Sequence, residues 1–247
     1  MENYELRQNS KNFFKANTQQ FVFALILIFL VTISFDAIER LFLMTYYQIP
    51  FTFNNFIQYD TLVDVVETQF NVGAILISLL INIIPTLISI GLSLAVLKGI
   101  DQGEFFVKDI FNVFKLNWGV LLTMVILIQV IVTFLSILII PGIIASYSLA
   151  MSVYIFYDRP NNSAIKSMKE SHAQMKGKRL KLFMLQLYYL AWILAVFLVA
   201  IVFVVINPIL GIAALFVQMG IVTYLSVLLT IVEVNFYKEN IRNLIGE

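Results

Sequence analysis

A compact group of basic residues marks the point where a polar stretch of the chain becomes apolar: Lys176, Lys178, Arg179 and Lys181. From Leu182 to Ile206 the sequence is apolar and long enough to cross a hydrocarbon core of about 30 Å. Basic side chains at such a boundary meet the phosphates of anionic lipids, at about 1 kcal/mol each. The four residues are therefore predicted to bind lipid headgroups. The alternative is that they only hold the loop on the cytoplasmic side.

The residues before this basic group have the spacing of an amphipathic helix. One predicted stripe contains Ile165, Met168, His172 and Met175, with lysines off it. His172 is the only histidine and has no second ligand nearby, so we interpret it as a solvated interfacial side chain. Because cysteine is also absent, we expect neither a metal site nor a cofactor.

Three amides lie near the centres of apolar segments, where polar groups are costly unless they are paired: Asn82, Gln129 and Gln218. They form a possible intramembrane polar cavity in one interpretation. In the other they make interhelical hydrogen bonds worth about 1–2 kcal/mol or less. None is ionisable, whereas proton-coupled transport usually needs a carboxylate within the membrane. Near Asn82, Pro85 removes one backbone hydrogen bond and is predicted to kink its helix.

Sequence patterns typical of enzymes are absent. The chain has no His-Glu-x-x-His, no glycine-rich phosphate loop and no Gly-x-Ser-x-Gly motif. We therefore expect no catalytic residues, although an enzyme acting on lipids is a third functional class beside a binding protein and a transporter. The basic region is tethered to a bilayer, so lipid rather than nucleic acid is its expected partner.

Composition places the chain among polytopic membrane proteins. It is 60% hydrophobic and 13% charged, with a mean hydropathy of +0.90, whereas soluble domains are about 25% charged. Apolar runs predict six transmembrane helices in three hairpins, within a single domain of residues 1–247. The predicted spans are about 18–38, 72–97, 118–140, 143–157, 182–206 and 209–234.

The distribution of charge predicts the orientation. With these spans, fifteen of the sixteen Lys and Arg residues fall on one side, and Arg40 alone falls on the other. Cytoplasmic loops are enriched in Lys and Arg, so both termini are predicted to be cytoplasmic. Short amphipathic interfacial helices are expected on the same side, including one around Phe106, Ile110, Val113 and Phe114.

Several short motifs resemble a known family. They are Leu6-Arg7…Lys15-Ala16-Asn17 before the first span, Ser171…Met175-Lys176-Gly177…Phe183…Trp192, and Phe236-Tyr237 after the last span. With these motifs the chain resembles a bacterial integral membrane family, domain of unknown function 975, which is common in Firmicutes. The resemblance implies a multi-span protein of the bacterial cytoplasmic membrane. The family has no established activity, so it supplies no catalytic residues.

Two functional hypotheses follow from the sequence. The preferred one is a non-catalytic membrane factor that binds anionic lipids, or a membrane protein or peptide partner, in envelope homeostasis or resistance to membrane-active peptides. The alternative is a small permease or export-related transporter. The basic interfacial segments favour the first hypothesis, and the kinked second span with its central amides favours the second.

Overall fold

The fold was analysed in a computed structural model, which describes residues 3–51, 72–206 and 208–243. These residues form helices, turns and short connections, without a β-strand among them. The helices are α1 (Asn3–Ala16), α2 (Thr18–Tyr46), α5 (Val72–Ile81), α6 (Ile83–Gln102), η1 (Val107–Lys115), α7 (Trp118–Ser136), α8 (Ile140–Leu149), α9 (Ser152–Asp158), α10 (Ala164–Gln174), α11 (Arg179–Ile206), α12 (Pro208–Tyr237) and η2 (Lys238–Arg242).

Within the described residues, six helical segments are long and apolar enough to cross a membrane, which confirms the predicted all-α polytopic fold. Their bounds differ from the predicted ones mainly where a helix continues into polar sequence. The last segment extends to Arg242, because α12 passes directly into the π-helix η2. The turn after α7 also lies earlier than predicted, since Pro141 stands in the first turn of α8, where a missing N–H costs little.

The predicted break in the second span lies at Asn82, between α5 and α6. The backbone N–H of Asn82 still donates to the carbonyl of Ser78 at 3.0 Å, and that of Thr86 donates to Asn82 at 3.2 Å. Pro85 stands in the first turn of α6 and has no N–H to donate. The chain therefore changes from one helix to the next at a single residue.

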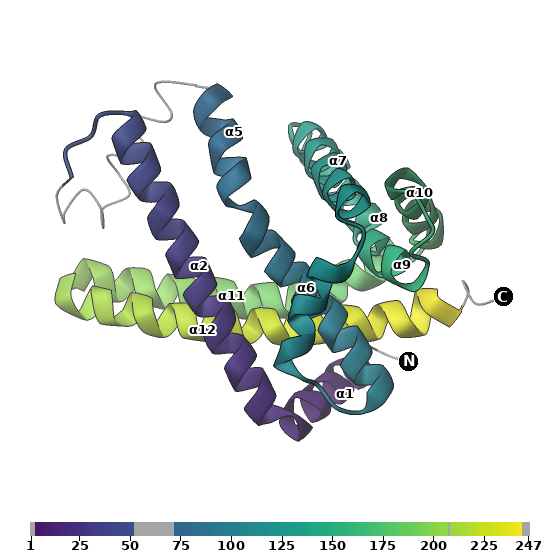
Figure 1. Cartoon of the computed structure of the whole chain (residues 1–247). Helices are drawn as coiled ribbons and strands as arrows, with labels where there is room; N and C mark the ends of the chain where they lie inside the picture. The colour runs from purple at the N-terminus through teal and green to yellow at the C-terminus, as the bar shows by residue number, and fades with distance from the viewer. Residues whose placement is uncertain (1–2, 52–71, 207, 244–247) are drawn as a thin grey trace. The chain divides into compact units, whose positions relative to one another are not determined.

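The chain divides into two units, a smaller one of residues 26–89 and a larger one of residues 1–25 and 90–247. The smaller unit contains most of α2, all of α5 and the start of α6. In the larger unit, α11 and α12 form a long antiparallel hairpin (Figure 1). Helix α1 packs on α12, α7 packs on α8, and α10 packs on α7, α8 and α9.

The N-terminal corner of the larger unit is held by stacked aromatic rings. Phe21 is fully buried, with its ring centroid 5.0 Å from that of Phe14 and 4.1 Å from that of Phe105. Asn17 adds a hydrogen bond, because its Oδ1 accepts from the backbone N–H of Phe105 at 2.9 Å. Aromatic pairs of this kind stabilise by about 0.5–1.5 kcal/mol beyond their buried area.

The predicted amphipathic segment around Ile110 forms the 3₁₀-helix η1. Ile110 and Val113 are buried, as the pattern indicates, while Phe106 and Phe114 are only half-buried. Asp109 is buried as well, and its Oδ1 lies 2.9 Å from Lys98 Nζ. Gly91 of α6 is the contact point, since a Cβ there would overlap the carbonyl oxygen of Ile110. Glycine is required here for close approach rather than for backbone freedom.

We expect Gly91→Ala to lower the free energy of unfolding by about 1–3 kcal/mol, because the added methyl group must displace a backbone carbonyl. The measurement is thermal unfolding of the purified protein in detergent. Gly220→Ala is the matched control: it also adds one methyl group in a helix, but meets no described atom within 4 Å. The control should leave stability unchanged or raise it by up to about 1 kcal/mol. Equal melting temperatures for both variants would contradict the close approach.

Candidate functional site

Helix α10 carries most of the exposed basic side chains near the predicted lipid-binding region. The Oγ of Ser163 caps it by accepting from the N–H of Lys166 at 3.3 Å. Its buried face consists of Ala164, Ser167, Met168 and Ser171. The helix is therefore amphipathic, as predicted.

The predicted stripe of α10 is buried at only two of its four positions. Met168 and Met175 are buried, whereas Ile165 is exposed, and His172 is exposed in agreement with its interpretation as a solvated side chain. The reason is a polar contact: Ser171 Oγ donates to the carbonyl of Ser148 at 2.8 Å and holds the serine face of α10 against α8. Small hydroxyl side chains allow close helix packing without large apolar area.

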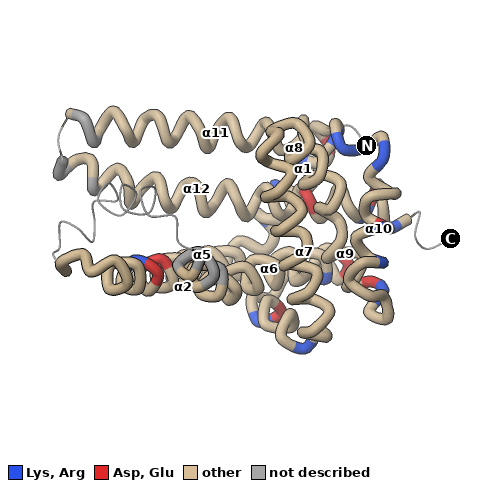
Figure 2. Tube along the Cα trace, turned by 90° about the horizontal axis from the view of Figure 1, so that it is seen from above, with Lys and Arg blue, Asp and Glu red and all other residues tan. Residues whose placement is uncertain are grey.

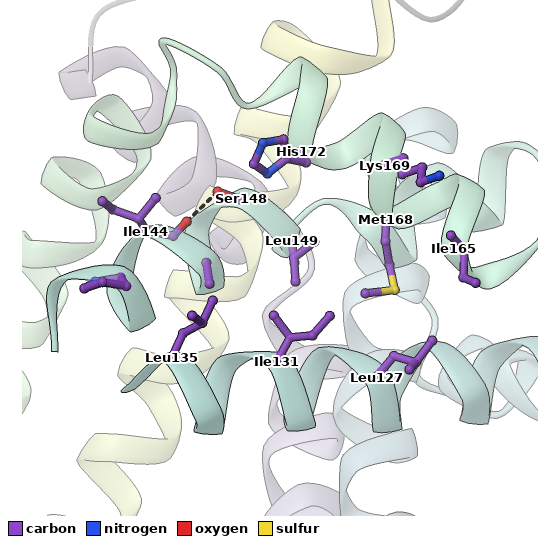
Figure 3. A pocket seen from close by; sticks show the side chains of 12 residues that line it. Leu127, Ile131, Leu135, Ile144, Ser148, Leu149, Ile165, Met168, Lys169 and His172 are labelled. Atoms are coloured by element: carbon purple, nitrogen blue, oxygen red, sulfur yellow. Dashed lines mark hydrogen bonds between the residues drawn. The ribbon is translucent and has the colours of Figure 1, made fainter. Parts of the chain in front are cut away.

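A groove of about 680 Å³ lies between α7, α8 and α10. Leu127, Ile131 and Leu135 point into it from α7, and Leu149 and Met168 point toward them from the opposite side (Figure 3). The remaining lining residues are Pro141, Ile144, Ala145, Ser148, Ile165, Lys169 and His172. Apart from the hydroxyl of Ser148, which donates to the carbonyl of Ile144, the groove is apolar except at the edge formed by α10, where Lys169 and His172 lie.

Arg179 adds a third basic group beside this edge. Its Nη2 lies 3.4 Å from the carbonyl oxygen of His172 and 3.5 Å from the Nε2 of the same residue. Its Nε is buried without a hydrogen-bond partner in the described part of the chain. Since a guanidinium carries five N–H donors, Arg179 keeps donors available for an anion. We refer to Lys169, His172 and Arg179 as the basic edge.

The four predicted headgroup-binding residues are in different environments. Lys178 Nζ donates to the backbone carbonyl of Asn240, and Lys181 Nζ donates to its side-chain oxygen at 3.1 Å. Burial lowers the pKa of Lys178, and the nearby charge of Lys181 lowers it further. Lys176 is exposed, and Arg179 is half-exposed. Two of the four thus bind Asn240 of η2, and only Arg179 contacts a residue that lines the groove, His172.

The end of α12 is fixed by an ionic cluster that the sequence analysis missed, here named the clasp: Asp101, Asp158, Tyr237, Lys238 and Arg242. Arg242 binds Asp158 through two contacts of 3.0 Å and also pairs with Asp101. Tyr237 donates to Asp158 at 2.7 Å, and Lys238 lies 2.8 Å from Asp101. The clasp joins the ends of α6, α9 and α12.

The three predicted cavity amides are not assembled into one site by the described contacts. Asn82 belongs to the smaller unit, where its Nδ2 donates to Glu39 of α2 at 2.9 Å. Gln129 is exposed on α7, and Gln218 is buried along a groove between α11 and α12. Among the described residues, no hydrogen bond joins Gln129 to Gln218.

A carboxylate within the last apolar helix was also missed. Glu233 of α12 is half-buried and accepts a 3.4 Å hydrogen bond from Gln186 of α11. Among the residues that the structure describes, it makes no ion pair. The signal in the sequence is Thr230-Ile231-Val232-Glu233-Val234, a single acid within an apolar run. An ionisable residue inside a span is a functional candidate because its burial is costly.

Comparison with known proteins identifies the family. The model of a protein of unknown function (DUF975) matches residues 121–244. The chain belongs to this family. A search of curated proteins and a search of solved structures each found no match. The DUF975 match includes the groove and its basic edge, Glu233 and most of the clasp, and of the clasp residues only Asp101 lies before it.

We expect Asp158→Ala and Arg242→Ala to show a coupling energy of about 1–3 kcal/mol in a double-mutant cycle, because each single change leaves a charged partner half-buried. The coupling energy is measured by unfolding the DUF975 protein in mixed micelles with a denaturing detergent. The control pair is Asp36 and Arg40, which share one exposed contact of 3.5 Å and should couple by about 0.5 kcal/mol or less. Strict additivity at Asp158 and Arg242 would show that the clasp does not stabilise the fold.

Proposed function

We propose that this DUF975 protein is a non-catalytic membrane factor that binds anionic lipid at its basic end, on the cytoplasmic side of a bacterial cytoplasmic membrane. The observation that carries the proposal is the outward face of α10 and of the turn after it. Lys166, Lys169, His172 and Lys176 are all exposed there. The ammonium groups of the three lysines make no hydrogen bond or ion pair with the described residues.

The distribution of charge in the larger unit supports this location. Helix α11 has no charged residue from Leu182 to Ile206, and α12 has none from Pro208 to Val232. The hairpin turns after Ile206, and helices α1 and α10 lie at its opposite end, where Lys and Arg gather (Figure 2). A basic end beside an uncharged hairpin is the arrangement expected where a helix meets anionic headgroups.

Neutralising the exposed lysines tests the proposal. We expect the variant Lys166→Gln, Lys169→Gln, Lys176→Gln to bind phosphatidylglycerol about 100-fold more weakly at low salt, because each removed charge contributes about 1 kcal/mol. Native mass spectrometry of the protein titrated with phosphatidylglycerol measures the affinity.

The charge-matched control is Lys11→Gln, Lys15→Gln, Lys115→Gln, which removes three exposed lysines from other elements. It should retain most of the affinity. Equal losses in both variants would indicate a general charge effect and contradict a dedicated site on α10.

A small permease is the second candidate function, and the Glu233–Gln186 pair favours it. A carboxylate held between α11 and α12 supplies the ionisable intramembrane group that the amides lack. Transport further requires that water reaches the interior of the bundle. The natural absence of cysteine makes this testable with single introduced cysteines.

If the protein is a closed lipid-binding factor, single cysteines at Asn82, Gln129 and Gln218 should react slowly with a water-soluble maleimide in intact cells. The reference is Lys176→Cys in permeabilised cells, because Lys176 is exposed. We expect the labelling rate at these three sites to be about one tenth of the reference rate or lower, since thiolate forms only where water reaches the sulfur. Rapid labelling at Gln129→Cys and Gln218→Cys would support an aqueous path and the permease function.

A further inference from the structure

The groove between α7, α8 and α10 combines two chemical features. Aliphatic side chains from three helices form its walls. Lys169 and His172 are the described lining residues with an ammonium or imidazole group, and both lie on one edge (Figure 3). Arg179 lies beside His172, at 3.4 Å from its carbonyl oxygen. An apolar floor with a cationic edge complements an amphiphile that has an apolar tail and an anionic head.

We propose that this groove holds one acyl chain of an anionic glycerophospholipid, with the phosphate against Lys169, His172 and Arg179. The inference rests on the proposed lipid-binding function. It adds a defined binding site, a stoichiometry of one lipid per protein and a role for the apolar residues that line the groove. It also separates the basic edge from Lys178 and Lys181, which bind Asn240.

The dimensions suit a chain rather than a headgroup alone. Leu127 and Leu135 are eight residues apart on α7, which corresponds to about 12 Å along the helix axis. The volume of about 680 Å³ falls within the range of about 300–1,000 Å³ that is typical of ligand sites. Aliphatic side chains line this length, so a hydrocarbon chain would bury apolar surface against all three helices.

The phosphate has donors on the basic edge. Lys169 is exposed and makes no ion pair with the described residues, so its ammonium group is available. Arg179 uses Nη2 toward His172, and its Nε is buried, so Nη1 carries the N–H donors that remain for a phosphate.

Photolabelling tests directly where the acyl chain of the lipid binds. The protein is placed in phosphatidylcholine nanodiscs that contain phosphatidylglycerol with a diazirine on one acyl chain, and labelled peptides are mapped by mass spectrometry. We expect labelling concentrated on residues 127–135 of α7. Ile144→Trp should reduce it about fivefold or more, because the larger indole fills the groove from a position already 46% exposed. Ile143→Trp is the matched control, since Ile143 is 45% exposed and is not among the residues that line the groove.

A second comparison tests the basic edge. Lys169→Gln should reduce labelling of α7 by the phosphatidylglycerol probe about fivefold, the effect of one charge near a phosphate. Lys115→Gln, which removes an exposed lysine outside the groove, should leave it unchanged. A phosphatidylcholine probe with the same diazirine should be insensitive to Lys169→Gln.

The outcomes separate this inference from the proposed function. If the triple lysine variant loses phosphatidylglycerol affinity but Ile144→Trp leaves labelling of residues 127–135 intact, the groove is not the seat and the proposed function stands. If affinity does not depend on the lysines, the proposed function falls. Recovery of a free fatty acid from the groove, or of a dimer that Ile144→Trp dissociates, would overturn the assigned occupant.

Discussion

The larger unit depends on a two-point ion pair between Arg242 and Asp158. Apolar helices in lipid gain little from any one register, because sliding exchanges one apolar contact for another. Polar ties select the register. Both carboxylate oxygens of Asp158 lie 3.0 Å from nitrogens of Arg242, and the Asp158 side chain is only 14% exposed. Tyr237 donates to the same carboxylate. The end of α12 is thereby joined to the end of α9, and through Asp101 to the end of α6.

This attachment also fixes the position of α10 and its groove. Helix α9 ends at Asp158, and the next residue, Arg159, lies 3.4 Å from Glu170 of α10. Asn162 donates to the same Glu170 at 3.2 Å. Further along, Ser171 binds the carbonyl of Ser148 on α8. Helix α10 is therefore tied along its length by polar contacts, which leaves its lysines directed outward and its Met168 directed into the groove.

Much of the fold could be predicted because lipid constrains composition. The apolar runs and the sorting of charge indicate six spans without any knowledge of packing, and the clustered lysines indicate where headgroups lie. The face of α10 that is buried could not be predicted from the spacing of its apolar residues, since most of the buried side chains are alanine or serine. Nor could the clasp, because Arg242 is 84 residues from Asp158 and 141 from Asp101. Glu233 was missed because it stands one residue before the predicted end of its span.

The order of synthesis gives the clasp a further consequence. Asp101 and Asp158 leave the ribosome long before Arg242, and Ser10, which accepts a hydrogen bond from Asn235 at 2.9 Å, precedes its partner by almost the whole chain. Until α12 and η2 are in place, Ser10, Asp101 and Asp158 lack these partners. Helix α12 and η2 thus complete the polar contacts of the larger unit. A chain cut short within α12 would leave polar groups on several helices without the partners that they have in the complete bundle.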